Sequence, residues 1–311
     1  MLFKIPQNII VSLIFISLGV LLFWLSMIEM GAMQFEGDYS LLGIGAIKNS
    51  YWLNSVCVIL LFTCSYVVHR INQKQRFVEG KSLSFILYSS LGLSACMVTS
   101  ISILDTFAVF LSLISLSIIL QIHNQKSVLG LLFMSSLVFG AATVFFYPSL
   151  LLFLISVFTI AFFRPFEVRN YAVIVVGVSL IGFYLFCSAL LFDLEVGFSN
   201  IEFSSIKSMI TFNSALIPLV LFSIFGLIGA LKIFINRAKF VVRQRNQLLA
   251  ISVYIVIQLV LFLILGNAVF WISIVPILSI FISYYYKTSA RKWLLDIVTL
   301  LFIVGLVWLK F

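Results

Sequence analysis

The stretch VLGLLFMSSLVFGAATVFFYPSLLLFLISVFTIAFF, from Val128 to Phe163, decides the fold of this chain. It contains two apolar runs without any charged residue, separated by the turn residues 147–149, and it is followed by the basic run RPFEVR at 164–169. An apolar run of about 17–25 residues is long enough to cross the hydrocarbon core of a bilayer as a helix. The stretch therefore predicts a hairpin of two membrane helices, and the rest of the chain repeats this pattern.

The whole chain has the composition of a membrane protein. Its 311 residues are 63% hydrophobic and 9% charged, with a mean hydropathy of +1.24, whereas soluble domains are about 45–50% apolar and about 25% charged. We therefore predict an all-α fold, a polytopic transmembrane helix bundle that forms a single integral membrane domain over residues 1–311. The net charge of +9 is carried by short loops, so we expect no nucleic-acid partner.

The apolar runs predict about eleven membrane helices, each long enough to cross a hydrocarbon core of roughly 30 Å. These predicted spans are Ile9–Ile28, Leu53–Val68, Leu83–Ser102, Phe107–Ile122, Val128–Phe145, Leu150–Phe163, Tyr171–Phe192, Ala215–Ile235, Leu248–Leu265, Ala268–Tyr285 and Trp293–Leu309.

The distribution of charge predicts the orientation. With a cytoplasmic N-terminus, sixteen of the nineteen Lys and Arg residues lie on the cytoplasmic side, and only Lys48, Lys207 and Lys310 lie outside. Short loops rich in Lys and Arg remain in the cytoplasm. Seven of the ten Asp and Glu residues lie on the opposite side. We predict a multi-pass protein of the bacterial inner (cytoplasmic) membrane, with the N-terminus cytoplasmic and the C-terminus extracytoplasmic.

Three outer acids are the candidate catalytic residues. Glu36 and Asp38 lie in the first predicted outer loop, and Asp105 lies in the very short second one, Ile103–Phe107. A carboxylate beside an apolar bundle can act as a general base toward a sugar or lipid hydroxyl, since a low dielectric raises its pKa. Surface acids that simply avoid the cytoplasmic side are the alternative. The sequence specifies neither a cofactor nor whether a metal joins these acids.

A basic stretch lies on the predicted cytoplasmic side. Arg237, Lys239, Arg243 and Arg245 fall together in the predicted loop Asn236–Gln247. We interpret them as an orientation signal that contacts anionic lipid head groups. A site for a phosphorylated ligand is the alternative interpretation.

Small residues and a proline predict details of helix packing. Gly140, Gly177, Gly182 and the segment Gly226–Ala230 occur where helices can approach closely. Pro276 lies inside the tenth predicted span and is expected to kink or break it, because proline removes one backbone hydrogen bond. Ionisable residues are nearly absent from the predicted spans, which disfavours an ion-coupled carrier.

Two resemblances follow from these features. The hairpin and its flanks, about 45 residues from Ser127 to Asn170, resemble multi-pass inner-membrane proteins of Bacteroidota classed as domain of unknown function six-four-two-seven. A more distant likeness is to GT-C membrane glycosyltransferases, which use polyprenyl-phosphate sugars and place a catalytic carboxylate in the first outer loop. That likeness implies Asp38 as the base and Asp105 as an assisting acid. This chain lacks the paired acids and the periplasmic acceptor domain of that class.

Three functions are therefore considered. The first is a non-catalytic or lipid-handling component of envelope biogenesis that works with partner membrane proteins and the lipid bilayer. The alternative is a GT-C-like glycosyltransferase that acts on a lipid-linked sugar at the outer face of the membrane. A small-molecule transporter is the third.

Overall fold

The computed structural model describes residues 51–75, 77, 103–122, 128–163, 167–192, 216–265 and 268–288. Every regular element in these ranges is a helix, so the predicted all-α class is confirmed for them. Eight of the eleven predicted spans coincide with these helices. The predicted spans Ile9–Ile28, Leu83–Ser102 and Trp293–Leu309 lie outside the described residues.

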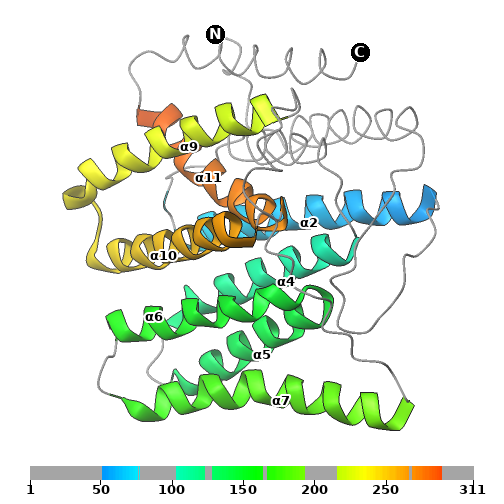
Figure 1. The fold of residues 1–311 in the computed structure, drawn as a ribbon. Coiled ribbons are helices and arrows are strands. Elements are labelled where there is room, and N and C mark those ends of the chain that lie inside the picture. The colour runs from blue at the N-terminus through cyan, green and yellow to red at the C-terminus, as the bar shows by residue number, and fades with distance from the viewer. Residues whose placement is uncertain are drawn as a thin grey trace.

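The helices follow one another along the chain as shown in Figure 1. Their bounds are α2 Tyr51–Gln75, α4 Ile103–Ile119, α5 Leu129–Phe145, η2 Tyr147–Leu152, α6 Phe153–Phe163, α7 Val168–Phe192, α9 Leu216–Ile235, η3 Arg237–Lys239, α10 Val242–Leu265 and α11 Ala268–Thr288. Two of them contain segments long and apolar enough to cross a bilayer, Val168–Cys187 in α7 and Val242–Phe262 in α10. On length and composition alone, these segments give weak support to a membrane location.

The predicted hairpin is present as a helix, a 3₁₀ turn and a second helix. Pro148 lies at the start of η2, where its missing N–H removes no helical hydrogen bond. The Ser149 backbone N–H and Oγ both donate to the Phe146 carbonyl, at 3.0 and 2.6 Å, and this fixes the turn. The packing of the hairpin is less obvious from sequence, because α5 makes its main contacts with α4 and α7 rather than with α6.

Helix α11 is the central element of the described bundle. It packs against α9, α10, α4 and α2, and almost every side chain resolved between Val269 and Ser283 is buried. A helix that is apolar on all sides is expected to be surrounded in this way. The helix continues through Pro276 without ending, so the break considered from sequence does not occur. Figure 1 shows α11 crossing between α9 and α10.

Glycines bring α9 close to α11. A Cβ added to Gly226 would lie 2.9 Å from the Cβ of Leu278, and one added to Gly229 would collide with the Phe281 carbonyl group. Because backbone atoms cannot move aside cheaply, this contact requires a residue without a side chain at 229. The predicted packing role of Gly226 and Gly229 is confirmed.

Helix α7 forms an edge of the described bundle. It contacts α5 through Gly177, where an added Cβ would collide with Ser136, and through Ile181, which lies 3.0 Å from a Cβ placed on Gly140. Gly182 has open space around it, so the prediction that it is a packing position is wrong. The exposed large apolar side chains of α7 are Val168, Val175, Val176, Phe183, Tyr184, Phe186, Leu190 and Leu191.

Candidate functional site

The structure describes one of the three candidate catalytic acids. Asp105 lies in the first turn of α4 and is partly buried, so the prediction that it belongs to a loop is wrong. A carboxylate there interacts favourably with the positive end of the helix dipole, which explains the residue without catalysis. Glu36 and Asp38 lie outside the described residues, and their proximity to Asp105 stays a prediction.

The basic stretch is more ordered than the predicted loop. Its first part forms η3, and α10 begins at Val242, so Arg243 and Arg245 lie in the first turn of a helix. Arg243 Nη2 donates to Gln75 Oε1 at 3.0 Å, and Arg245 Nε donates to the Phe240 carbonyl at 2.9 Å. Arginines at a helix N-terminus oppose the helix dipole, and these bonds help to hold them there.

The four basic residues therefore differ in their surroundings. Arg243 and Arg245 are half-buried and donate hydrogen bonds to other groups of the protein, whereas Lys239 is exposed. Arg237 begins η3. Contact of this group with lipid head groups or with a phosphorylated ligand stays a prediction.

Glutamine side chains join three helices near this point, in an arrangement that we call the inner network because it lies on the side that the charge distribution predicts to be cytoplasmic. Gln247 of α10 donates through Nε2 to Gln75 Oε1 of α2 and, at 3.0 Å, to the carbonyl of Leu120, just after the end of α4. Gln75 Nε2 donates to the same carbonyl at 3.3 Å. The last carbonyl groups of a helix lack partners within it. The two glutamines supply partners to the Leu120 carbonyl, and Arg243 also donates to Gln75. Gln247 Oε1 is buried without a hydrogen-bond partner among the described residues.

Two further polar contacts lie near the inner network. Lys74 Nζ donates to Gln121 Oε1 at 2.7 Å. His69 and Gln73, one turn apart on α2, have their Nε2 atoms 2.8 Å apart. An amide nitrogen can only donate, so the imidazole accepts and is neutral in this arrangement. Burial lowers the pKa of His69 below its ordinary value of 6.5, which agrees with the neutral form.

Aromatic rings join helices at the other end of the described bundle. We call this arrangement the outer aromatic cluster, because it lies on the side that the charge distribution predicts to be extracytoplasmic. The rings of Phe107 and Phe145 meet edge to face with centroids 4.7 Å apart. Those of Phe146 and Phe270 do the same at 5.4 Å. Edge-to-face contacts of this kind are favourable because the positive ring edge meets the negative face. The cluster links α4, the end of α5 and the start of α11.

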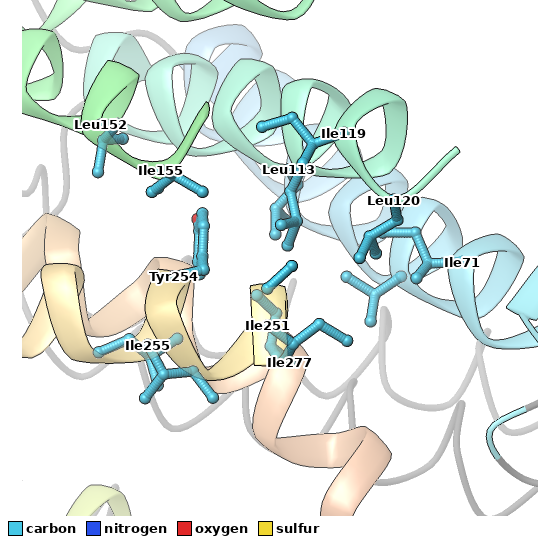
Figure 2. Packing of buried hydrophobic residues seen from close by; sticks show 14 of the residues in the cluster. Ile71, Leu113, Ile119, Leu120, Leu152, Ile155, Ile251, Tyr254, Ile255 and Ile277 are labelled. Atoms are coloured by element: carbon cyan, nitrogen blue, oxygen red, sulfur yellow. The ribbon is translucent and has the colours of Figure 1, made fainter. Parts of the chain in front are cut away.

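Between these two ends lies a group of uncharged polar side chains, the core polar cluster. It consists of Ser112 on α4, Tyr254 and Gln258 on α10 and Ser273 on α11, all of them buried. Figure 2 shows Tyr254 rising from α10 toward Ile155. Sequence reasoning missed this cluster. The signal was the spacing of Tyr254 and Gln258, which lie four residues apart and so share one face of an otherwise apolar helix.

Hydrogen bonds link the side chains of the core polar cluster. Ser112 Oγ donates to the Val109 carbonyl at 2.7 Å. It also lies 3.0 Å from the Tyr254 hydroxyl, and either hydroxyl of this pair can be the donor. The Tyr254 oxygen also interacts with the side chains of Ser273 and Gln258. Among the described residues, Gln258 Oε1 is buried without a hydrogen-bond partner.

The described residues contain no group of three or more His, Cys, Asp and Glu side chains placed to hold a metal ion. Comparison with known proteins adds no relative, since no family model, no curated protein and no solved structure matches this chain.

Proposed function

We propose that this chain is a multi-pass protein of the bacterial inner membrane that acts as a non-catalytic component of the cell envelope and works with lipid and partner membrane proteins. The membrane assignment is supported by composition and by the apolar segments of α7 and α10. The proposed topology has about eleven helices, a cytoplasmic N-terminus and an extracytoplasmic C-terminus.

Helix directions support this topology. Alternation along the chain predicts that α4 and α10 run in opposite directions, and their contacts agree, because Ser112 meets Tyr254 while Leu120 meets Gln247. Alternation also predicts that α9 and α11 run in the same direction. Gly226 faces Leu278 and Gly229 faces Phe281, as parallel helices require. If a predicted span between them did not cross the membrane, the relative direction of one of these helix pairs would be reversed.

Helix ends support the same topology. The ends that the charge count assigns to the cytoplasm meet in the inner network, which joins Gln75, Leu120 and Gln247. Lys232 of α9 also lies over the Tyr285 ring of α11, at 4.6 Å from its centroid. The ends assigned to the outside meet in the outer aromatic cluster. Sorting of this kind is expected when all helices cross one bilayer.

The observation that carries the proposed role is the one-sided packing of α7. One face is fitted to α5 through Gly177, while the other exposes large apolar side chains along most of the helix. Contiguous exposed apolar surface marks an interaction site in a soluble protein and a lipid or partner contact in a membrane protein. We therefore assign the exposed face of α7 to acyl chains and to a partner helix.

Photo-crosslinking tests this role. A photoreactive phenylalanine analogue placed at Phe183 or Phe186, both exposed on α7, should give adducts with lipid and with a distinct membrane protein in cells. The same analogue at Phe139, which is fully buried on α5, should not. Cysteine variants at Phe183 and Phe186 provide a check with a water-soluble maleimide. If both are labelled as fast as a cysteine in an appended, solvent-exposed tag, α7 does not lie in the membrane.

The core polar cluster favours a second candidate, a transporter of small uncharged solutes. Polar groups enclosed between packed membrane helices mark substrate pathways in many transporters. Uptake of radiolabelled glycerol and urea into proteoliposomes tests this candidate. Rates above those of protein-free liposomes, lost in a Tyr254→Phe, Gln258→Leu double variant, would support transport. Equal rates would exclude transport of these two solutes.

A further inference from the structure

We propose that the core polar cluster binds one small, uncharged hydrogen-bond donor at Gln258 Oε1. The balance of donors and acceptors carries this inference. Ser112 bonds the Val109 carbonyl and the Tyr254 hydroxyl, and Ser273 donates to the Phe270 carbonyl at 2.7 Å. None of these groups bonds the Gln258 amide oxygen, which is buried and has no hydrogen-bond partner among the described residues.

The acceptor is held in place rather than free to turn toward water. Gln258 is 1% exposed and lies one helical turn from Tyr254, whose hydroxyl it contacts. Tyr254 is fully buried and is itself held by Ser112 of another helix. Buried polar atoms without a protein partner are usually met by an ordered water or a ligand.

The surroundings define the chemical class of the bound molecule. The groups identified around Tyr254 are Ser112, Ser273, Gln258 and Cys64, all of them neutral. Because the described residues identified there carry no charge, they would offer a cation or an anion no counter-charge to offset the cost of leaving water. The unmet group is an acceptor, so the bound molecule must present an N–H or O–H. The apolar side chains beside Tyr254, including Ile155 in Figure 2, limit its size.

The site is enclosed, because Gln258 is 1% exposed and Tyr254 is fully buried. Along α4, Ser112 lies about 12 Å from Leu120 of the inner network and about 8 Å from Phe107 of the outer aromatic cluster, at 1.5 Å per residue. The packing must therefore open for a bound molecule to exchange. Water and the hydroxyl or amide group of a small solute share the required chemistry.

Thermal unfolding of the full-length protein in lipid nanodiscs tests the proposal by the sign of an effect. Gln258→Leu and Gln258→Met keep a similar volume but remove the amide. Tyr254→Phe measures the loss that comes from the tyrosine hydroxyl and its contact with Gln258. If the oxygen is also paired with a bound donor, both Gln258 variants should lower Tm by about 2–5 °C in the Tyr254→Phe background as well. If the oxygen is unpaired, removing the amide in that background should raise Tm, and this result would overturn the proposal.

Ser283→Ala is the control for loss of a buried polar group. Ser283 lies on α11, is fully buried, and donates to the Ser279 carbonyl of its own helix at 2.7 Å. Because its one bond within the described part of the chain is local, its replacement should change Tm by less than about 1 °C. A decrease in Tm in this variant as large as in the Gln258 variants would mean that any loss of a buried polar group destabilises the bundle. The Tm data would then contradict a specific bound donor at Gln258.

A density map of the wild-type protein in nanodiscs, prepared without added small molecules, provides the second measurement. Density within about 3.2 Å of Gln258 Oε1 is expected. A compact peak identifies water and an extended one a co-purified solute. A dry cavity, or an Oε1 paired with another protein group, would contradict the proposal. These results are separate from crosslinking at α7, which tests the proposed function and does not depend on occupancy of this site.

Discussion

The two ends of the described bundle are joined by different chemistry. At the inner network, amide groups of Gln75 and Gln247 bond the carbonyl end of α4. At the outer aromatic cluster, rings such as Phe146 and Phe270 meet edge to face without polar bonds. Polar networks depend on having every member satisfied, whereas apolar contacts depend on volume. The two ends should therefore respond differently to substitution, salt and pH.

The largest effect is expected at the outer end. Phe270→Ala removes a fully buried ring from between α11 and the end of α5 and leaves a cavity. Substitutions of this kind cost about 3 kcal/mol. The loss should appear as unfolding at lower SDS concentration and should be the same at low and high salt. Phe270→Leu should recover part of the loss, and full stability of the Ala variant would show that the ring does not join the helices.

At the inner end a double-mutant cycle is more informative than a single change. Gln247→Leu removes the donor that bonds Gln75 Oε1, and Gln75→Leu removes the acceptor of Gln247 Nε2. Each single variant should lose about 2 kcal/mol, because a buried amide is left partly unsatisfied. The double variant should lose less than the sum, by at least about 0.5 kcal/mol. Additive losses would mean that the two amides do not interact.

A smaller effect is expected for the arginine of the same network. Arg243→Met keeps much of the apolar stem but removes the bond to Gln75, and should lower the unfolding free energy by about 1 kcal/mol. Among the described residues, Arg245 donates only to the nearby Phe240 carbonyl, so Arg245→Met is the matched control and should cost less. Equal losses, both abolished by high salt, would indicate a general charge effect rather than a specific bond.

The smallest effect distinguishes the two ends by pH. His69 lies just beyond the predicted span Leu53–Val68, and burial lowers its pKa from 6.5. As pH falls through 6.5, His69 becomes protonated in the unfolded chain but remains neutral in the folded chain. The free energy of unfolding therefore falls until the folded imidazole is also protonated. Melting in nanodiscs between pH 7.5 and 5.5 should show this loss, and His69→Gln should reduce it. An unchanged profile in the variant would assign the loss to another group.

Much of the helical framework could be predicted from sequence, because apolar runs of this length have few other uses. The described spans all coincide with helices, and Gly140, Gly177, Gly226 and Gly229 lie at close helix contacts. Helix ends were predicted less well. The end of an apolar run marks where the chain leaves the apolar environment, whereas the backbone hydrogen bonds of the helix continue beyond that point. For this reason α2 extends to Gln75 and α10 begins before Arg243.

The candidate sites were harder to predict because they depend on contacts between distant residues. Asp105 looked like a loop acid because α4 begins before the predicted apolar run. The core polar cluster joins serines, a tyrosine and a glutamine that are ordinary residues within separate apolar runs. Ser112 and Tyr254 are 142 positions apart, and no spacing rule connects them. The pairing becomes visible once α4 and α10 are known to run in opposite directions.

The most direct test of the account is the side of the membrane on which each end lies. In a cysteine-free chain, a single cysteine at Leu150 in η2 or at Lys239 in η3 occupies an exposed position at one end. A membrane-impermeant maleimide applied to intact spheroplasts should label Leu150→Cys at once and Lys239→Cys only after the membrane is opened. Labelling of both variants in intact spheroplasts, or the reverse order, would contradict the proposed topology.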